Sequence, residues 1–417
     1  MKNSRVSRPW RIAAVGLIAG TVLLSSGCGH GDKSPSWQGG GNGNGSGVNN
    51  SAQADGGTAS ATPSPSPTPA TVAVVSPKSD ATGVVAATEV KYTSEDPENT
   101  SVKVTDDKGE EVKGTLDKDD KVWRPEKALA YGTKYTVTVN GTASEGKGGT
   151  TTSTFTTMAK PSKVIRVTSF LGDNNVVGVG MPLIIKFSRA IPASYRDDVE
   201  RRMTVTASPA QVGSWGWISP TEVHYRPKEF WKANSKVFYK VQLAGVPLGN
   251  DYYGKSDLTV DLKIGRSFVM TVSNKTKQMT VKQDGKVIKT LPVSLGKPST
   301  PSSSGTMIVM EKMRHTVFDT TDTDPKNGYK TPIDFAQRIT WSGQFIHAAP
   351  WSEGKQGKVN VSHGCVNVSE AMGAWLFSRT MMGDPITVSG TEEKLKQGNG
   401  WTDFNLSWAA WKKLSYL

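Results

Sequence analysis

The hexapeptide Ser362-His363-Gly364-Cys365-Val366-Asn367 decides how the C-terminal third of this 417-residue chain is interpreted. Cys365 is one of only two cysteines, and the other, Cys28, closes an N-terminal apolar segment. If Cys28 is used in anchoring, Cys365 has no disulfide partner within the chain, in a compartment where thiols usually pair. A solitary exported thiol with histidines nearby is typical of a catalytic nucleophile.

A catalytic cysteine needs a base or a positive field, because an unperturbed thiol is mostly protonated at neutral pH. His347 is the preferred base: it ends an apolar strand expected over residues 344–347, and a polar loop returns the chain to Cys365. His363 is less suited, since residues i and i+2 of a strand point to opposite faces. Gly364 lets the backbone approach closely, so the amides of Gly364 and Cys365 are candidates for an oxyanion hole.

Around this string, residues 266–389 are predicted to form one β-rich domain. Alternating apolar residues predict strands over 268–272 and 278–282, and Asp284-Gly285 predicts a tight hairpin turn after them. A further strand is expected over 306–310. A helix is expected over 369–382, with Gly383 as its C-cap.

The tail, residues 390–417, is rich in aromatic side chains spaced mostly three or four apart. Packing of this tail onto the catalytic domain is the preferred interpretation, and a peptide- or glycan-binding surface is the alternative. The apolar positions are Trp401, Phe404, Trp408, Trp411 and Leu414.

Residues 71–265 contain an internal repeat. The pairs Arg124-Pro125 and Arg226-Pro227 lie 102 residues apart, the size of an immunoglobulin-like sandwich. Each pair precedes a stretch in which apolar and polar residues alternate, over 133–139 and 235–241, as in half-buried strands. Two sandwiches are therefore predicted, over 71–158 and 159–265. The alternative is that any β-rich chain gives such resemblances. Neither copy shows a nucleophile or a metal cluster, so a spacer or docking role is expected.

The N-terminal 70 residues predict export and tethering. Residues 1–28 have a basic start, a short apolar run and a Gly27-Cys28 end, which resembles a lipoprotein signal whose cysteine is lipidated. A plain cleaved signal and an uncleaved anchor are the alternatives. Residues 29–70 are rich in Gly, Ser and Pro with almost no large apolar side chain, so they predict a disordered tether. We expect a protein on the outer face of the cell membrane, acting in the cell wall.

His347 followed by the string at 362–367 resembles the signature of the L,D-transpeptidase (YkuD-type) catalytic domain. The region 278–296 is similar to the start of that domain. The full layout is similar to actinobacterial members of this family: a lipoprotein signal, a tether, two immunoglobulin-like sandwiches, the catalytic domain with its short helix, and a Trp-rich tail. The resemblance implies a mainly β fold.

The resemblance also implies a set of site residues. Cys365 is the implied nucleophile and His347 the base, oriented through the carbonyl of Ala348, while His363 supports the site. Tyr329 is implied beside the oxyanion pocket, and residues 350–361 with Trp351 are implied to form a lid. The implied substrate contacts are Tyr329, Ser342, Gly343, His347 and Asn367.

The implied reaction is a two-step acyl transfer between peptidoglycan stem peptides, one the donor and the other the acceptor. Cys365 attacks the third residue of a tetrapeptide stem, D-alanine leaves, and the amine of a second stem resolves the thioester into a 3→3 cross-link. Carbapenem-type β-lactams are the implied inhibitors. Neither a metal nor an organic cofactor is expected.

The same residues are compatible with several other functions. Water as the acceptor gives an L,D-carboxypeptidase, and a cell-wall cysteine peptidase or a non-catalytic wall-binding lipoprotein are further alternatives. His347, His363 and Cys365 could also be zinc ligands. Against this, the sequence shows neither a helical His pair nor a Cys-x-x-Cys spacing. The formal charge of +13 is scattered over strands with no nucleic-acid motif, so attraction to the polyanionic wall is preferred over nucleic-acid binding.

Overall fold

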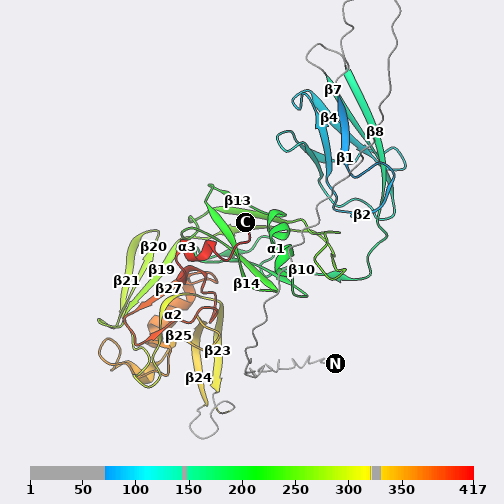
Figure 1. Cartoon of the computed structure of the whole chain (residues 1–417). Coiled ribbons are helices and arrows are strands. Elements are labelled where there is room, and N and C mark those ends of the chain that lie inside the picture. The colour runs from blue at the N-terminus through cyan, green and yellow to red at the C-terminus, as the bar shows by residue number, and fades with distance from the viewer. Residues whose placement is uncertain (1–70, 143–147, 320, 322–329) are drawn as a thin grey trace, which may run out of the picture. The chain divides into compact units, whose positions relative to one another are not determined.

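A computed structural model describes residues 71–142, 148–319, 321 and 330–417 of the chain (Figure 1). The expected lipid attachment at Cys28, the tether and the implied substrate contact Tyr329 lie outside these residues. The described part is mainly β, with short helices. Within it, no helix has the length and apolar character needed to cross a membrane.

The first sandwich pairs two four-stranded sheets, in the orders β1-β3-β6-β5 and β2-β8-β7-β4. Its core lies between them, where the alternating side chains Tyr135, Val137 and Val139 of one strand are all buried, as predicted. The strands are β1 (Val72–Ser76), β2 (Ala81–Val84), β3 (Val90–Ser94), β4 (Thr100–Thr105), β5 (Gly114–Asp117), β6 (Val122–Pro125), β7 (Lys134–Thr142) and β8 (Gly148–Thr157).

The second sandwich repeats this arrangement, with sheet orders β10-β12-β15-β14 and β11-β18-β16-β13 and a small β17-β9 pair. Both sandwiches also pair an early strand in parallel with the last long strand, β2 with β8 and β11 with β18. The identical strand orders support the repeat inferred from the two Arg-Pro pairs. The elements are β9 (Val164–Ile165), β10 (Val167–Ser169), β11 (Val176–Val177), β12 (Leu183–Phe187), α1 (Ala193–Arg201), β13 (Met203–Ser208), β14 (Gly213–Ser219), β15 (Glu222–Pro227), β16 (Lys236–Val241), β17 (Tyr253–Gly254) and β18 (Leu258–Ile264).

The C-terminal part contains a six-stranded sheet, β21-β20-β19-β27-β22-β28, and a four-stranded sheet, β23-β24-β25-β26. Their shared core includes Phe268, Met270, Ile346 and Val366. The elements are β19 (Phe268–Ser273), β20 (Gln278–Gln283), β21 (Lys286–Pro292), β22 (Ser303–Ile308), β23 (Glu311–Asp319), β24 (Lys330–Arg338), β25 (Phe345–Ala348), η1 (Pro350–Ser352), β26 (Val366–Val368), α2 (Glu370–Arg379), β27 (Pro385–Ser389), β28 (Glu393–Lys394), η2 (Asp403–Asn405) and α3 (Trp408–Lys412).

Local predictions in this part were mostly confirmed. The hairpin turn between β20 and β21 has positive φ angles at Asp284 (49°) and Gly285 (82°), as a tight two-residue turn requires. The expected helix is shorter than predicted and is not capped by Gly383, because α2 ends at Arg379 with an extended C-cap at Thr380. The Thr380 hydroxyl donates to the Leu376 carbonyl, which fixes the end of the helix there.

The tail packs on the catalytic domain, as expected, and also on the second sandwich. Within the tail, β28 joins the six-stranded sheet beside β22, and Leu395 belongs to the core of the catalytic domain. The later aromatic residues, with α3, pack on the second sandwich, which was not expected. Figure 1 shows α3 beside β14. The Trp411 side chain is fully buried, and its Nε1 donates to the Ser214 carbonyl at 3.0 Å. A Cβ atom at Gly216 of β14 would lie 2.9 Å from the Trp411 ring. The missing side chain on β14 thus leaves the space that the indole fills.

Candidate functional site

Two neighbouring parallel strands bring the predicted base and nucleophile to one cleft. In β25 and β26, His347 is paired with Asn367, and Cys365 directly precedes β26. The cleft has a volume of about 600 Å³. Its lining residues are Phe318, Thr331, Ile333, His347, Trp351, Ser352, Lys355, Val361, Ser362, His363, Cys365 and Asn367.

The His347 ring is oriented by its own backbone neighbour. Its Nδ1 donates to the carbonyl of Ala348 at 2.8 Å, so the proton of the neutral ring is on Nδ1 and Nε2 has a lone pair. The ring is 4% exposed and lies against the rings of Phe318 and Trp351. Burial lowers the pKa of His347 to about 4, and the hydrogen bond to Ala348 opposes this only in part. His347 is therefore a neutral base at physiological pH.

The Cys365 thiol is protonated at rest. It is 7% exposed, and its Sγ donates to the Gly343 carbonyl at 3.8 Å. Burial raises the pKa of Cys365 to about 12. The resting site thus holds an uncharged thiol and an uncharged imidazole, rather than a thiolate–imidazolium pair.

Two serines hold the loop that carries Cys365. Ser362 Oγ donates to the Cys365 carbonyl at 2.7 Å and accepts from the Gly364 amide at 3.2 Å. Ser302 Oγ donates to the Gly364 carbonyl at 2.7 Å and accepts from the Gly296 amide at 2.9 Å. Gly364 has φ +122°, which favours glycine at this position. Because the Gly364 amide already has an acceptor, it must exchange Ser362 for substrate to serve an oxyanion.

His363 and Asn367 both line the cleft but differ in exposure. His363 is exposed, and its Nε2 lies 3.1 Å from Nζ of Lys297. Asn367 is 3% exposed, and its Nδ2 donates to Ser352 Oγ at 3.3 Å. Among the described residues its Oδ1 has no hydrogen-bond partner, which is costly for a buried acceptor. An N–H group of a ligand would satisfy it.

The predicted substrate contacts Ser342 and Gly343 lie on the turn between β24 and β25. Gly343 has φ +91° and its carbonyl accepts from the Cys365 thiol, so this turn reaches that side chain. The Ser342 hydroxyl accepts from Asn399 Nδ2 at 2.9 Å and lines a separate, smaller pocket.

Sequence reasoning missed several residues of this site. Ser302 and Lys297 lie in a Pro/Ser-rich loop far from the catalytic string, and nothing in their spacing indicates a contact with it. Phe318 and Lys355 also belong to the cleft. For Lys355 there was one signal in the sequence. Residues 350–361, the expected lid, were predicted to return the chain from His347 to Cys365, and Lys355 lies within them.

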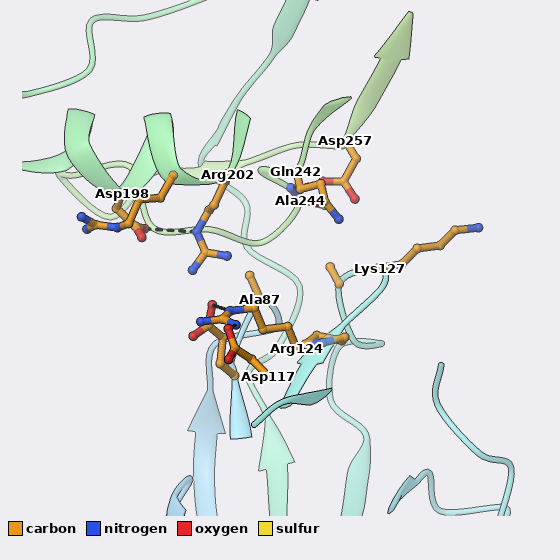
Figure 2. Close-up of a pocket in the computed structure, with 13 residues that line it drawn as sticks. Ala87, Asp117, Arg124, Lys127, Asp198, Arg202, Gln242, Ala244 and Asp257 are labelled. Carbon is orange, nitrogen blue, oxygen red and sulfur yellow. Dashed lines mark hydrogen bonds and ion pairs between the residues drawn. The ribbon is translucent and has the colours of Figure 1, made fainter. Parts of the chain in front are cut away.

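A second pocket, shown in Figure 2, is lined by residues of the two sandwiches. Two ion pairs, each within one sandwich, line it: Arg124 with Asp117 at 2.9 Å, and Arg202 with Asp198 at 3.3 Å. No histidine or cysteine lines it. In the described ranges, no three His, Cys, Asp or Glu side chains gather so that they could hold a metal ion.

Comparison with known proteins gives two family matches. Residues 81–247 match a bacterial Ig domain, a span that includes strands of both sandwiches, and residues 267–388 match an L,D-transpeptidase catalytic domain. The chain is 35% identical over 339 residues to L,D-transpeptidase 2 of Mycobacterium tuberculosis, covering 80% of this chain and 82% of that protein.

L,D-transpeptidase 5 of the same species is 33% identical over 327 residues, covering 76% of this chain and 70% of that protein. A solved L,D-transpeptidase in complex with imipenem is 32% identical, with a TM-score of 0.47. That alignment covers 53% of this chain and 97% of that one.

Proposed function

Because this chain belongs to the L,D-transpeptidase family and is an enzyme of the acyltransferase type, we propose that it forms 3→3 cross-links between peptidoglycan stems. The observation that carries the proposal is that Cys365 and His347 line one cleft at the ends of neighbouring strands, where burial favours an uncharged thiol and an uncharged imidazole. No metal or organic cofactor has a part in this chemistry.

The first step is transfer of an acyl group to the thiol. His347 Nε2 takes the Cys365 proton as Sγ attacks the carbonyl carbon of the third residue of a tetrapeptide stem. The tetrahedral adduct then breaks its C–N bond, and the leaving D-alanine amine takes the proton back from His347. In the second step the side-chain amine of an acceptor stem attacks the thioester carbonyl and loses a proton to His347. The C–S bond then breaks, and the departing Cys365 sulfur takes that proton back.

A neutral resting pair suits this sequence of steps. Burial disfavours both charged forms, so the proton moves only when the substrate carbonyl is in place to accept the sulfur electrons. The developing oxyanion is held by backbone amides at Gly364 and Cys365, and by Tyr329. Ser342, Gly343 and His363 contact the stem in this proposal. Asn367 Oδ1 accepts from a substrate N–H, which is supported by its buried and unsatisfied state.

The same thiol is expected to open carbapenem-type β-lactams. Attack of Cys365 Sγ on the lactam carbonyl breaks the C–N bond of the ring and leaves a thioester. The lactam nitrogen takes the proton through His347. The nitrogen of the broken C–N bond stays covalently attached to the acyl group through the rest of the drug. No fragment corresponding to D-alanine is released, so the adduct keeps the mass of the whole drug.

The proposal is tested with purified protein, tetrapeptide muropeptides and a carbapenem, using intact-protein mass and product mass as readouts. Cys365→Ala should lose both the adduct and the cross-linked products while remaining folded. His347→Ala should slow acylation by roughly 10² to 10⁴-fold, as expected for loss of a positioned base. His315→Ala is the matched control, because that ring is exposed on β23 and pairs with Asp334.

Two results contradict the proposal. An adduct that persists in Cys365→Ala places the nucleophile elsewhere. Products that are only shortened, never joined, show that water is the acceptor and that the enzyme is an L,D-carboxypeptidase or a peptidase.

We also propose that Cys28 is lipidated and holds the enzyme on the outer face of the cell membrane. The support is the Gly27-Cys28 end of the apolar signal segment and the Gly/Ser/Pro tether after it. Cys28→Ala should release the protein from the membrane fraction or block its maturation. Unchanged partitioning into detergent would contradict lipidation.

A further inference from the structure

Among the described residues that line the cleft around Cys365, the fixed charge is positive. Among the residues that line it, Lys355 is the one with a permanent charge, and no Asp or Glu of the described chain lines this cleft. Lys355 lies on the exposed lid, where its amide donates to the Ser352 carbonyl at 2.8 Å. The backbone that carries this ammonium is therefore held by the lid's own turns.

The nearest acid on the lid does not neutralise this lysine. Glu353 Oε1 accepts from the Glu370 amide at the start of α2, at 3.1 Å. No ion pair joins Lys355 to a carboxylate among the residues that the structure describes. Its ammonium is thus available to an anion that enters the cleft.

A second ammonium contacts the histidine that lies two residues before Cys365. Lys297, half-buried on the loop between β21 and β22, places Nζ 3.1 Å from Nε2 of His363. An ammonium only donates, so Nε2 is the unprotonated nitrogen and the neutral His363 ring has its proton on Nδ1. Burial, and then the charge of Lys297, lower the pKa of His363. Of these two contacting side chains, Lys297 therefore carries the positive charge and His363 is neutral.

We propose that Lys355 and Lys297 form a carboxylate-binding rim that holds the free terminal carboxylate of the donor stem. This rests on the proposed function, in which the donor ends in a carboxylate one residue beyond the scissile carbonyl. Lys297 contacts His363, which lines the cleft two positions before Cys365, so its charge lies beside the loop that carries the thiol. Asn367 Oδ1 accepts a substrate N–H deeper in the cleft, and together these contacts orient the stem with its terminus toward the rim.

The rim also gives a physical reason why the enzyme would prefer a tetrapeptide donor over a longer one. In a stem that is one residue longer, the terminal carboxylate lies about 3.5 Å further along an extended chain. A neutral peptide bond then replaces the anion beside Lys355 and Lys297, and the charge-assisted contact is lost.

The kinetic test uses the full chain with a tetrapeptide donor and its C-terminal carboxamide. Lys355→Gln and Lys297→Gln should each raise KM for the acid about three- to fivefold, the range of an exposed ion pair, with kcat nearly unchanged. Neither change should alter KM for the carboxamide. Lys355→Arg should retain the wild-type KM. Lys358→Gln is the control, because Lys358 is exposed on the same lid and does not line the cleft.

A second measurement does not depend on cross-linking activity. Cys365 is alkylated with anionic iodoacetate and with neutral iodoacetamide, and intact mass gives the ratio of the two rates. Both lysine-to-glutamine variants should lower this ratio, with a smaller change at high salt, because salt screens exposed charges. Lys358→Gln should leave it unchanged.

The outcomes separate the two proposals. An unchanged alkylation ratio, or an equal rise of KM for the acid and the carboxamide, overturns the carboxylate rim. A lowered ratio in a protein that joins no stems supports the cationic rim and contradicts the proposed cross-linking function.

Discussion

At the scale of single residues, burial determines the protonation of both reacting groups. His347 is kept neutral and Cys365 is kept protonated, each by loss of water rather than by a charged neighbour. In the proposed mechanism, the imidazole of His347 therefore activates the Cys365 thiol during attack, not before it.

The pH dependence of acylation follows from the lowered pKa of His347. The base must be unprotonated, so the rate of β-lactam acylation should rise as pH increases through about 4 and stay level from about 5 to 8. A histidine in water would give its inflection near 6.5 instead. Intact mass at timed intervals gives the rate, and circular dichroism shows that the fold persists at each pH. An inflection near 6.5 would mean that water reaches the ring.

Gly343→Ala tests the backbone that accepts the thiol hydrogen bond. No atom lies within 4 Å of the added Cβ, so the cost comes from the φ of +91° alone, about 1–2 kcal/mol of stability. Any relief of that strain moves the Gly343 carbonyl away from Cys365, and acylation should slow. Gly354→Ala on the lid is the matched control, with open space and no positive φ. Equal effects at both positions would contradict this role of the turn.

At the scale of elements, one short helix fastens the tail. α3 begins at an N-cap where Ser407 accepts from the Ala410 amide, and it buries Trp411 against the side-chain-free surface of Gly216. A five-residue helix has little stability of its own. Its packing on β14 therefore accounts for its presence.

Trp411→Ala should lower the free energy of unfolding by about 3–5 kcal/mol, because it leaves a cavity and an unsatisfied Ser214 carbonyl. The loss is measured by denaturant unfolding. Trp341→Ala is the control, since that side chain is 55% exposed, and it should cost under about 1 kcal/mol. Similar losses for the two variants would show that α3 contributes no more than a surface residue does.

At the scale of the whole molecule, contacts distant in sequence join the second sandwich to the C-terminal part. One apolar core combines the second sandwich with Ile308, Met310 and Trp401. A buried polar link accompanies it: His224 of β15 lies between Asp403 of η2, at 2.7 Å, and Glu222, at 2.8 Å. The second sandwich is therefore more than a spacer.

His224 should make this link sensitive to pH. Its two carboxylate neighbours outweigh burial and raise its pKa to about 9, above the ordinary value near 6.5. The folded state then binds more protons than the unfolded state between these pH values, so the stabilisation is complete below about 6.5 and is lost as pH rises through 9. The difference in Tm between the wild type and His224→Gln should shrink over this range. His315→Gln, at an exposed ring, is the control; a constant difference for His224→Gln would contradict the link.

The sequence alone determined the features that depend on the order of a few neighbouring residues. Alternation of apolar residues defined the strands around Tyr135 and Val237, a dipeptide defined the turn at Asp284-Gly285, and the string at 362–367 with His347 indicated the catalytic family. These patterns are readable because side-chain period and turn geometry act over a few residues.

The tertiary structure decided what depends on distant partners. It brought Ser302 and Lys297 to the loop that carries Cys365, placed Trp411 of the tail on β14 and enclosed His224 between carboxylates. It also shortened α2, since a contact at Thr380 outweighed the helical pattern beyond it. These contacts, and the burial that shifts the pKa values of His347 and Cys365, involve residues far apart in the sequence. No spacing along the chain therefore encodes them.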